Sequence, residues 1–425
     1  MQKVVKSNLK KLTGEITIPA DKSISHRSII LPCLANGKSI IKNFSTGQDP
    51  HSTINIFKAL GVNIEYHTDS TVIIESNGEL KQPANILNCG NSGTTIRLVS
   101  GILAGQNFTS VLTGDKSLSK RPMKRIITPL ELMGANIDSN DFKTPLKIQG
   151  QPLTGISYNS ALASAQVKSC ILLAGLSANG ITTFTEPYIS RNHTEIMLKH
   201  MGANITVDGT KVSIQKSKLE PIKIEICGDI SSAAYFIAAG LIIPNSKIIL
   251  KNVGLNPTRT GIIDIAKQMG GNIKILNKKE VCGEITGDIQ VEYSNLKGCN
   301  IKGEIIPRLI DEIPIIAVLA TQAEGETIIS DAQDLKNKES DRISALVTEL
   351  KKLGADIEEK PDGMIINGKK TLIGNNIVET YHDHRLAMSL YVAGLVCQKE
   401  IVINGFEWVN ISFPEFEEMF DKLSS

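Results

Sequence analysis

Leu60-Gly61-Val62-Asn63-Ile64 is a short stretch that recurs, with small changes, four more times along this chain. The other copies are Met133-Gly134-Ala135-Asn136-Ile137, Met201-Gly202-Ala203-Asn204-Ile205, Met269-Gly270-Gly271-Asn272-Ile273 and Leu353-Gly354-Ala355-Asp356-Ile357. The pattern is typical of a helix that ends at a C-cap glycine and is followed at once by a strand. The glycines lie about 65 to 85 residues apart, which is too long a period for a solenoid repeat. The chain is therefore predicted to consist of copies of a small α/β unit.

A second pattern alternates with the first. Six segments open with a small polar residue and continue into a stretch rich in Ala, Ile and Leu; they start near Asp21, Asn91, Ser164, Asp229, Asp311 and Asp383. Asp, Asn and Ser are preferred helix N-caps because their side chains accept hydrogen bonds from unpaired backbone N–H groups. A strand-like run follows each predicted helix. The unit is thus predicted as a helix, a strand, a second helix ended by glycine, and one or two further strands.

Six first helices and five glycine-ended second helices leave one unit incomplete. We expect its second helix at residues 414–423 and its missing strands at residues 4–18, so that the chain ends close the last unit. Six units divide into two domains of three: residues 20–228, and residues 229–425 together with 1–19. Such domains would enclose a cleft, with hinges near Pro19 and Gly228. A single large α/β sheet is the alternative, and the helix lengths and low aromatic content do not exclude it.

The overall composition is that of an ordinary globular protein. Of the 425 residues, 41% are hydrophobic and 21% are charged, and the net charge is +2, so no global attraction to nucleic acid or membrane is expected. No apolar run reaches the roughly 18 residues of a membrane span, and the N-terminus contains no secretory signal. Seven cysteines without a C-x-x-C pair indicate reduced thiols in a cytoplasmic protein. Nothing specifies an oligomer interface, and a monomer is expected.

Cations recur at the predicted helix starts. Lys and Arg are unfavourable there because a helix N-terminus carries about half a positive charge. Their repetition makes sense where backbone N–H groups and side chains together hold an anion. One such residue alone is better explained as a solvated surface charge, whereas six at matching places are not: Lys22, Arg121, Arg191, Arg259, Arg342 and Arg385.

The densest of these groups is Asp21-Lys22-Ser23-Ile24-Ser25-His26-Arg27. Lys22 supplies a mobile point charge, Arg27 a bidentate fork and Ser23 a neutral donor, which together suit a phosphate. Asn91-Ser92-Gly93-Thr94 opens the next unit, where Gly93 lets a ligand approach the backbone. The spacing fits neither a P-loop nor a dinucleotide-binding fingerprint.

Two carboxylates stand among the cations. Glu339 lies in Lys338-Glu339-Ser340-Asp341-Arg342, and Asp311 opens a predicted helix. Each is a candidate general acid or base; the alternatives are an N-cap for Asp311 and a surface ion pair for Glu339. His382 and His384 form an H-x-H, but no third ligand lies at a suitable spacing, so no metal site is predicted.

Taken together, these motifs resemble those of the 5-enolpyruvylshikimate-3-phosphate (EPSP) synthase family over essentially the whole chain. The motifs are the Asp21–Arg27 stretch, Gly90-Asn91-Ser92-Gly93-Thr94, Lys120-Arg121-Pro122, Lys338–Arg342 and Asp383-His384-Arg385. The resemblance implies two domains of three βαβαββ units each, an inside-out α/β barrel that closes over its substrates. It also implies transfer of the enolpyruvyl (carboxyvinyl) group of phosphoenolpyruvate to the 5-hydroxyl of shikimate 3-phosphate. This reaction releases phosphate, uses no metal or other cofactor, and belongs to the shikimate pathway to chorismate and the aromatic amino acids.

Residue roles follow from the resemblance alone. The implied shikimate 3-phosphate ligands are Lys22, Ser23, Arg27, Ser164, Ala165, Gln166, Arg191, Asp311 and Lys338. The implied phosphoenolpyruvate ligands are Lys22, Gly93, Arg121, Gln166, Arg342 and Arg385. Asp311 would accept the proton of the 5-hydroxyl, and Glu339 would deliver and later remove a proton on carbon, assisted by Lys22 and with His384 nearby.

The chain departs from some family members at Leu98, at Ala165 and at Asn410-Ile411-Ser412, where a lysine is absent. Ser190-Arg191 is similar to a sub-branch in which Arg191 replaces lost contacts. UDP-N-acetylglucosamine enolpyruvyl transferase is the nearest alternative, but its loop cysteine is absent between residues 113 and 122. A non-catalytic homologue that binds phosphorylated ligands is a second alternative, although it would be expected to lack Asp311 and Glu339.

Overall fold

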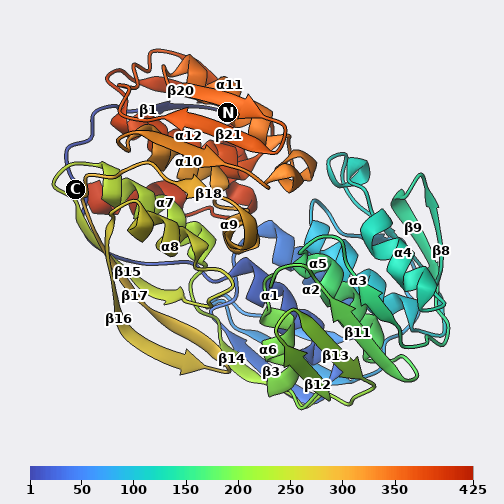
Figure 1. Ribbon diagram of the computed structural model, residues 1–425. Helices are drawn as coiled ribbons and strands as arrows, with labels where there is room; N and C mark the ends of the chain where they lie inside the picture. Colours follow the sequence, from blue (N-terminus) through green and yellow to red (C-terminus); the bar gives the residue numbers. More distant parts are fainter. Residues whose placement is uncertain (425) are drawn as a thin grey trace. The chain divides into compact units, whose positions relative to one another are not determined.

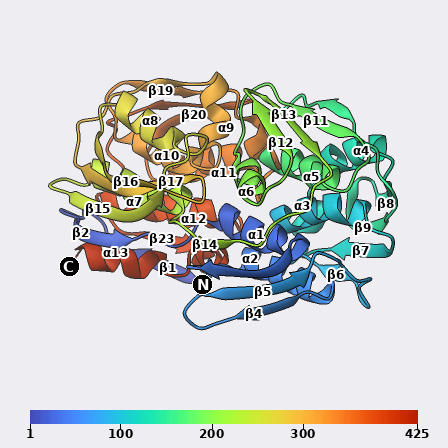
Figure 2. The ribbon, with the colours of Figure 1, turned by 90° about the horizontal axis from the view of Figure 1, so that it is seen from below.

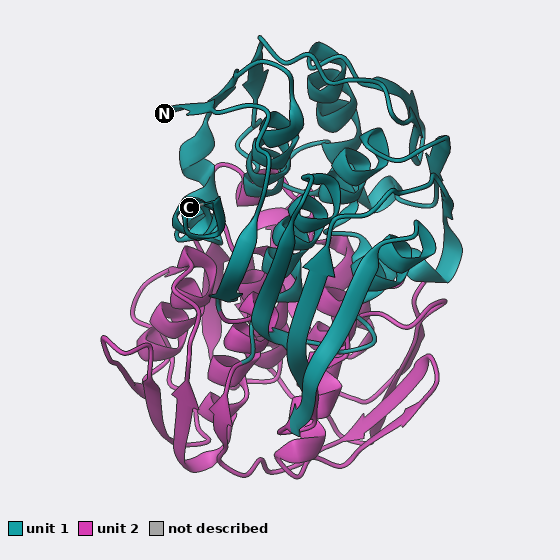
Figure 3. Cartoon of the chain, turned by 90° about the vertical axis from the view of Figure 1, so that its left-hand side faces the viewer, with its two compact units in different colours: residues 1–19, 227–280, 285–425 teal, residues 20–226, 281–284 magenta. Residues whose placement is uncertain are grey.

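The structure is a computed structural model that describes residues 1–424. The chain divides into two compact units (Figure 3). Unit 1 comprises residues 1–19, 227–280 and Ile285 onward, and unit 2 comprises residues 20–226 and 281–284. Within residues 1–424, none of the helices is both long and apolar enough to cross a membrane.

Both units are built from copies of one α/β repeat, as predicted. A repeat consists of a strand, a first helix, a parallel strand, a second helix and an antiparallel hairpin, joined in one small sheet. In unit 2 the second repeat is β6 (Leu87–Asn88), α3 (Gly93–Ala104), β7 (Thr109–Thr113), α4 (Lys124–Leu132), β8 (Asn136–Asn140) and β9 (Lys143–Gln149). The third is β10 (Ser157–Asn159), α5 (Ala165–Gly175), β11 (Ile181–Thr185), α6 (His193–His200), β12 (Ile205–Asp208) and β13 (Lys211–Gln215). Strands β11, β13 and β12 run side by side in both ribbon views (Figure 1, Figure 2), and α5 packs against β11 and β13.

The first and fourth repeats exchange their opening strands. The first repeat is α1 (Lys22–Ile30), β3 (Asn36–Lys42), α2 (Gln48–Ala59), β4 (Asn63–Tyr66) and β5 (Val72–Asn77), completed by β14 (Lys223–Glu225), which pairs parallel with β3. The fourth is α7 (Ile230–Ile242), β15 (Lys247–Gly254), α8 (Gly261–Gln268), β16 (Asn272–Val281) and β17 (Glu284–Glu292), completed by β2 (Thr13–Thr17), which pairs parallel with β15. Each unit therefore completes its own sheets, although the chain enters and leaves unit 2 part-way through a repeat.

The chain ends close the last repeat only in part as predicted. The fifth repeat is β18 (Asn300–Ile301), α10 (Ile313–Thr321), β19 (Glu326–Ile329), α11 (Arg342–Lys352), β20 (Asp356–Lys360) and β21 (Gly363–Asn367). The sixth is β22 (Ile377–Glu379), α12 (His384–Val396), β23 (Ile401–Asn404), α13 (Phe416–Ser424) and β1 (Gln2–Val5), which pairs antiparallel with β23. The assignment of β2 to this repeat was wrong. Strand β22 already occupies the parallel position beside β23, and the vacant parallel position lies beside β15 in the fourth repeat.

The recurring glycines end the second helices, as predicted. Gly61, Gly134, Gly202, Gly270 and Gly354 all have positive φ, between 82° and 97°. At Gly134 the amide donates to Glu131 O at 2.9 Å, and the next amide, of Ala135, donates to Leu130 O at 2.9 Å. A side chain strains this left-handed conformation, so glycine allows the chain to leave the helix and enter the next strand directly.

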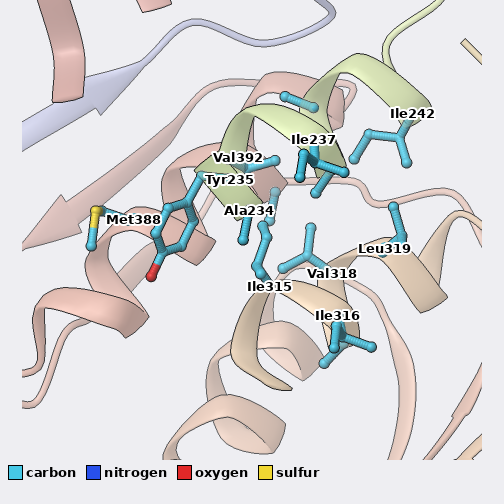
Figure 4. Packing of buried hydrophobic residues seen from close by; sticks show 14 of the residues in the cluster. Ala234, Tyr235, Ile237, Ile242, Ile315, Ile316, Val318, Leu319, Met388 and Val392 are labelled. Carbon is cyan, nitrogen blue, oxygen red and sulfur yellow. The ribbon is translucent and has the colours of Figure 1, made fainter. Parts of the chain in front are cut away.

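The helices form the inside of each unit and the sheets form the outside. In unit 1 all nine residues of α10 are buried, as are 12 of the 13 residues in each of α7 and α12. Figure 4 shows Ala234 of α7, Ile315 and Val318 of α10 and Val392 of α12 gathered between these helices. The sheets bury one face only, as the alternation of buried and exposed residues along β9 shows.

Close helix packing in unit 2 depends on a glycine. A Cβ at Gly101 of α3 would lie 2.1 Å from Cys170 O of α5. The sides of these helices are apolar and closely packed. The polar residues that could bind a ligand or take part in catalysis therefore concentrate at the helix starts.

Candidate active site

The predicted site residues lie at helix N-termini in both units. Lys22, Gly93, Ala165, Arg342 and His384 are the first residues of α1, α3, α5, α11 and α12. Arg385 follows His384, and Arg191 comes two residues before α6. A helix N-terminus favours negative charge, so these residues stand at positions that are expected of anion sites.

The candidate site residues form two groups, one in each unit. The unit 2 cluster is Lys22, Ser23, Arg27, Asp49, Gly93, Arg97, Arg121, Gln166 and Arg191. The unit 1 cluster is Asp311, Glu312, Lys338, Glu339, Arg342, Asp383 and Arg385.

In the unit 2 cluster, the start of α1 brings together residues that are far apart in sequence. Asp21 caps α1 by accepting from Ile24 N at 2.8 Å, which fixes the turn that presents Lys22 and Ser23. Lys22 Nζ lies 3.2 Å from Asp49 Oδ2 of α2. Arg191 donates to Ser23 Oγ at 2.8 Å across 168 residues of sequence. Ser23 and Arg191, which the resemblance assigns to the same substrate, thus lie in contact within unit 2.

Arg27 is buried behind this turn, with 3% of its surface exposed. Its guanidinium donates to Thr194 Oγ1 at 2.6 Å, to Ser23 O at 3.0 Å and to Ser169 Oγ at 2.9 Å. Burial lowers the pKa of Arg27 to about 10, the charge of Arg191 lowers it further, and Glu195 opposes the shift. A buried cation with a lowered pKa is incompletely compensated by the protein, so an anion beside it would be stabilised.

Arg121 and the start of α3 form a second part of the unit 2 cluster. Arg121 donates to Asn91 Oδ1 at 2.9 Å, and Ser92 caps α3 by accepting from Thr95 N at 3.1 Å. A Cβ on Gly93 would lie 3.1 Å from Arg121 NH1 and 2.6 Å from Arg97 NH1. Two guanidinium groups thus lie against a helix N-terminus at the one residue with no side chain.

Arg97 is a residue that the sequence reasoning missed. It lies one turn after Gly93 on α3 and donates to Gln166 Oε1 of α5 at 2.9 Å, while Gln166 Nε2 donates to Thr94 Oγ1 at 3.1 Å. These bonds fix the amide of Gln166. The available signal was the spacing of four residues from Gly93, which places Arg97 on the same helix face. Ser164 is the N-cap of α5, and its side chain makes no capping bond.

The unit 1 cluster centres on Arg342, which is 1% exposed. Its Nε donates to Asp383 Oδ2 at 2.7 Å and its NH2 to Asp383 Oδ1 at 3.3 Å, a bidentate pair. NH2 also donates to Glu339 Oε2 at 2.5 Å, and NH1 lies 3.5 Å from Asp311 Oδ1. One guanidinium therefore holds the two candidate acid–base carboxylates and the N-cap of α12.

Cations surround Asp311. Lys338 Nζ lies 3.4 Å from Asp311 Oδ1, and Arg385 NH2 lies 4.0 Å from Oδ2. Arg385 also donates to the backbone oxygen of Asp311 at 3.1 Å. Asp311 is not the N-cap of α10, because Glu312 occupies that position and Asp311 precedes it.

In the unit 1 cluster, neighbouring carboxylates more than balance the cost of burying the positive charge of each arginine. Burial lowers the pKa of Arg342, but the charges of Asp383 and Glu339 outweigh burial and raise the pKa well above its ordinary value. The pKa of Arg385 is likewise raised, since Asp311 and Glu312 outweigh the effect of burial. The carboxylates of this cluster already neutralise its cations.

His384 and the H-x-H have no metal partner set within residues 1–424: no group of three or more His, Cys, Asp or Glu residues there could hold a metal ion. His384 is 3% exposed at the start of α12. His382 lies with its ring edge-on to Trp408, with ring centroids 4.7 Å apart.

A family model described as EPSP synthase (3-phosphoshikimate 1-carboxyvinyltransferase) matches residues 6–420. The chain belongs to the EPSP synthase family. A Bacillus subtilis protein named 3-phosphoshikimate 1-carboxyvinyltransferase is 52% identical over 425 residues, which cover 99% of each chain. The EPSP synthase of Acinetobacter baumannii superposes with a TM-score of 0.89 at 43% identity, covering 99% of this chain and 98% of that one.

The fold extends beyond close relatives. The enolpyruvyl transferase NikO from Streptomyces tendae has a TM-score of 0.81 at 17% identity, covering 99% of this chain and 96% of that one. That likeness concerns the fold alone. Membership of the EPSP synthase family confirms the resemblance drawn from the motifs, together with the two-domain α/β fold that it implied.

Proposed function

We propose that this chain transfers the enolpyruvyl group of phosphoenolpyruvate to the 5-hydroxyl of shikimate 3-phosphate and releases phosphate. The observation that carries the proposal is the pairing of Asp311 and Glu339 on the single guanidinium of Arg342, at 3.5 Å and 2.5 Å. The reaction needs one proton moved on oxygen and one on carbon, and this arrangement supplies one carboxylate for each.

The addition step joins the acceptor oxygen to the donor. Asp311 accepts the proton of the 5-hydroxyl while the oxygen attacks the substituted alkene carbon. Glu339 delivers a proton to the methylene carbon, which becomes a methyl group, and a tetrahedral ketal phosphate results. Lys338, Arg342 and Arg385 lie 3.4, 3.5 and 4.0 Å from the carboxylate of Asp311 that takes part in this step.

The elimination step reverses the proton transfer on carbon. Glu339 removes a proton from the methyl group, the C–O bond to phosphate breaks, and the alkene forms again, now attached to the acceptor. Lys22 assists at the departing oxygen as a mobile cation, and His384 lies beside Arg385 at the start of α12.

The unit 2 cluster binds the anionic groups in this proposal. The two substrates carry roughly six negative charges if both phosphates are near −2. Shikimate 3-phosphate is bound by Asp311 and Lys338 of unit 1 and by seven residues of unit 2: Lys22, Ser23, Arg27, Ser164, Ala165, Gln166 and Arg191. Phosphoenolpyruvate is held by Arg342 and Arg385 of unit 1 and by four residues of unit 2: Lys22, Gly93, Arg121 and Gln166.

The proposal requires that the two units share one active site in the cleft between them, and that closure of the cleft excludes water. It also includes a cytoplasmic monomer. A single species of about the monomer mass in light scattering would support that state, and a stable dimer would exclude it.

The decisive experiment measures phosphate release by the purified protein with phosphoenolpyruvate and one acceptor at a time. Release with shikimate 3-phosphate, and not with UDP-N-acetylglucosamine, is expected. Release only with the nucleotide sugar would assign the other enolpyruvyl transfer. Binding without release for either acceptor would make the protein a phospholigand sensor.

A further inference from the structure

A buried lysine in unit 2 plays no part in the reaction as derived above. Lys168 lies on α5 with 1% of its surface exposed. Its ammonium has three acceptors: Glu186 Oε1 at 2.7 Å, Glu195 Oε1 at 2.8 Å and the backbone oxygen of Ser190 at 3.2 Å. The three donors of a lysine are thereby all engaged by the protein.

Glu186 binds the same residue through its backbone N–H. Its Oε1 accepts from Ser190 N at 2.8 Å, so the Ser190 residue is held by its N–H and by its C=O. Glu186 follows β11 directly and is 3% exposed, and its own amide is bonded to Thr210 O at 3.1 Å. Lys168 and Glu186 thus form a buried clamp around the residue that precedes Arg191.

The clamp adjoins the Arg27 contacts. Lys168 and Ser169 are neighbours on α5, and Thr194 and Glu195 are neighbours on α6. On α5, Lys168 belongs to the clamp and Ser169 Oγ accepts from the Arg27 guanidinium. On α6 the order is reversed, since Thr194 Oγ1 accepts from Arg27 and Glu195 binds Lys168. The same two helices therefore fix Arg27 and the backbone before Arg191.

Stability alone does not explain why the clamp is built from buried charged groups. Two carboxylates share one ammonium in a site closed to solvent, and one oxygen of each, Glu186 Oε2 and Glu195 Oε2, has no hydrogen-bond partner among the described residues. Buried ion pairs of this kind rarely stabilise a fold more than apolar side chains of similar size would. A role in holding a fixed geometry accounts better for their presence.

We propose that Lys168 and Glu186 are positioning residues that fix the backbone N–H and C=O of Ser190 and thereby aim the Arg191 side chain at the anionic acceptor. This inference rests on the proposed function, in which Arg191 binds shikimate 3-phosphate. Arg191 reaches Ser23 Oγ at 2.8 Å from a segment without helix or strand, so its placement depends on the backbone before it. The side chains of Tyr188 and Ile189 on that segment are exposed by 44% and 45%, and the burial of Ser190 by the clamp is what ties the segment down.

The test is Glu186→Gln, which keeps the volume and one acceptor oxygen but removes the charge. The KM for shikimate 3-phosphate is expected to rise roughly tenfold, with little change in kcat or in the KM for phosphoenolpyruvate. Lys168→Met should raise the same KM, and Lys168→Arg, which can still donate to Ser190 O, should recover much of it. A merely structural role would instead lower the thermal midpoint and move both KM values together.

A double-mutant cycle with Arg191→Ala isolates the mechanism. Since the clamp acts through Arg191, Glu186→Gln should have little further effect on acceptor binding once Arg191 is absent. Full additivity of the two substitutions would overturn the inference. Asp288→Asn is the matched control, because Asp288 in unit 1 also binds a lysine, Lys251 at 2.6 Å, and a backbone amide, Asn252 N at 2.9 Å. It should leave the KM for the acceptor unchanged.

The outcomes separate this inference from the proposed function. If the unaltered protein releases no phosphate with shikimate 3-phosphate, the proposed function fails. If it does release phosphate and the three clamp variants, folded by circular dichroism, keep its KM for the acceptor, the positioning role fails. Should Glu186→Gln not fold, the contrast between Lys168→Met and Lys168→Arg decides the matter by the same readout.

Discussion

The two clusters use the same residue types at the same kind of place, yet their charge balance differs. The unit 2 cluster contains five cations and one carboxylate, whereas the unit 1 cluster contains three cations and four carboxylates. The pKa of Arg27 in unit 2 is lowered to about 10, chiefly by burial. The pKa values of Arg342 and Arg385 in unit 1 are raised, because neighbouring carboxylates outweigh burial.

The difference assigns a task to each unit. Burial lowers the pKa of Arg27, whose charge an incoming anion would stabilise, so the unit 2 cluster is suited to binding. Cations that already hold carboxylates fix those carboxylates in place, so the unit 1 cluster is suited to proton transfer. Substitutions of the unit 1 carboxylates Asp311 and Glu339 should therefore affect chiefly kcat, and substitutions of the unit 2 arginines should affect chiefly KM.

The substitution Glu339→Gln is the strongest test of this division of tasks between the two clusters. Turnover is expected to fall about 10²–10⁴-fold, because the group that moves a proton on carbon is lost while an oxygen that can accept from Arg342 remains. Substrate binding should change little. Steady-state phosphate release measures both. Glu358→Gln, at a side chain that is 67% exposed on β20 of the same unit, is the control. An unchanged kcat in Glu339→Gln would remove the division of tasks.

A second test addresses the compensation in unit 1. Asp383→Asn removes the charge from a fully buried bidentate partner of Arg342 and should destabilise the protein by about 3 kcal/mol. The single tryptophan, Trp408, lies in unit 1, so its fluorescence during urea unfolding reports on this unit. Asp356→Asn, at a side chain that is 52% exposed, is the control. A loss no larger than that of the control would mean that Asp383 does not anchor Arg342.

In unit 2 the corresponding substitution should affect binding. Arg27→Ala is expected to raise the KM for shikimate 3-phosphate roughly 10- to 100-fold, since hydrogen bonds to charged groups contribute about 1.5–3 kcal/mol. The kcat should fall much less. The same measurement with unphosphorylated shikimate is the critical comparison. An equal rise in the KM for that acceptor would show that Arg27 does not recognise the phosphate. Lys124→Ala, at an exposed cation that begins α4, is the matched control.

Much of this organisation could be predicted from sequence because its signals are local. A C-cap glycine and an N-cap Asp or Ser act within one helical turn. The roles of Gly61 and Asp21 could therefore be predicted from the neighbouring sequence. The sheet partner of β2 could not be predicted, because an alternating strand pattern specifies a buried face and not a neighbour. Its expected place in the last repeat was wrong for that reason.

The site divides in the same way. Lys22, Gly93, Arg342 and Arg385 were found because each stands at a helix start. The contacts that support the site were not predicted: Arg97 meets Gln166 across 69 residues, and Asp383, which was expected only as a helix start, meets Arg342 across 41. Lys168 looked like an ordinary helix residue, and only its burial beside Glu186 and Glu195 distinguishes it. Supporting contacts of this kind depend on tertiary packing, which no local pattern encodes.

The smallest expected effect tests the excess of positive charge in unit 2 through its stability. His26, on α1 between Lys22 and Arg27, has a pKa well below 6.5; burial is the largest cause, and the charges of Lys22 and Arg27 add to it. The folded protein keeps His26 neutral, whereas the unfolded chain protonates it near pH 6.5. The unfolded state therefore gains protons as the pH falls, and the free energy of unfolding decreases by about 1.4 kcal/mol between pH 7.5 and 5.5.

His26→Gln should remove that part of the pH dependence while it keeps a side chain able to bond to Thr53. Urea unfolding followed by circular dichroism at the two pH values measures the difference. His67→Gln, at a side chain that is 47% exposed, should leave the pH dependence unchanged. If His26→Gln and the unaltered protein lose the same stability on acidification, His26 is protonated in the folded state. The start of α1 would then carry a further compensated cation, and the contrast in charge balance between the two units would be smaller than the contacts of Lys22 and Arg27 imply.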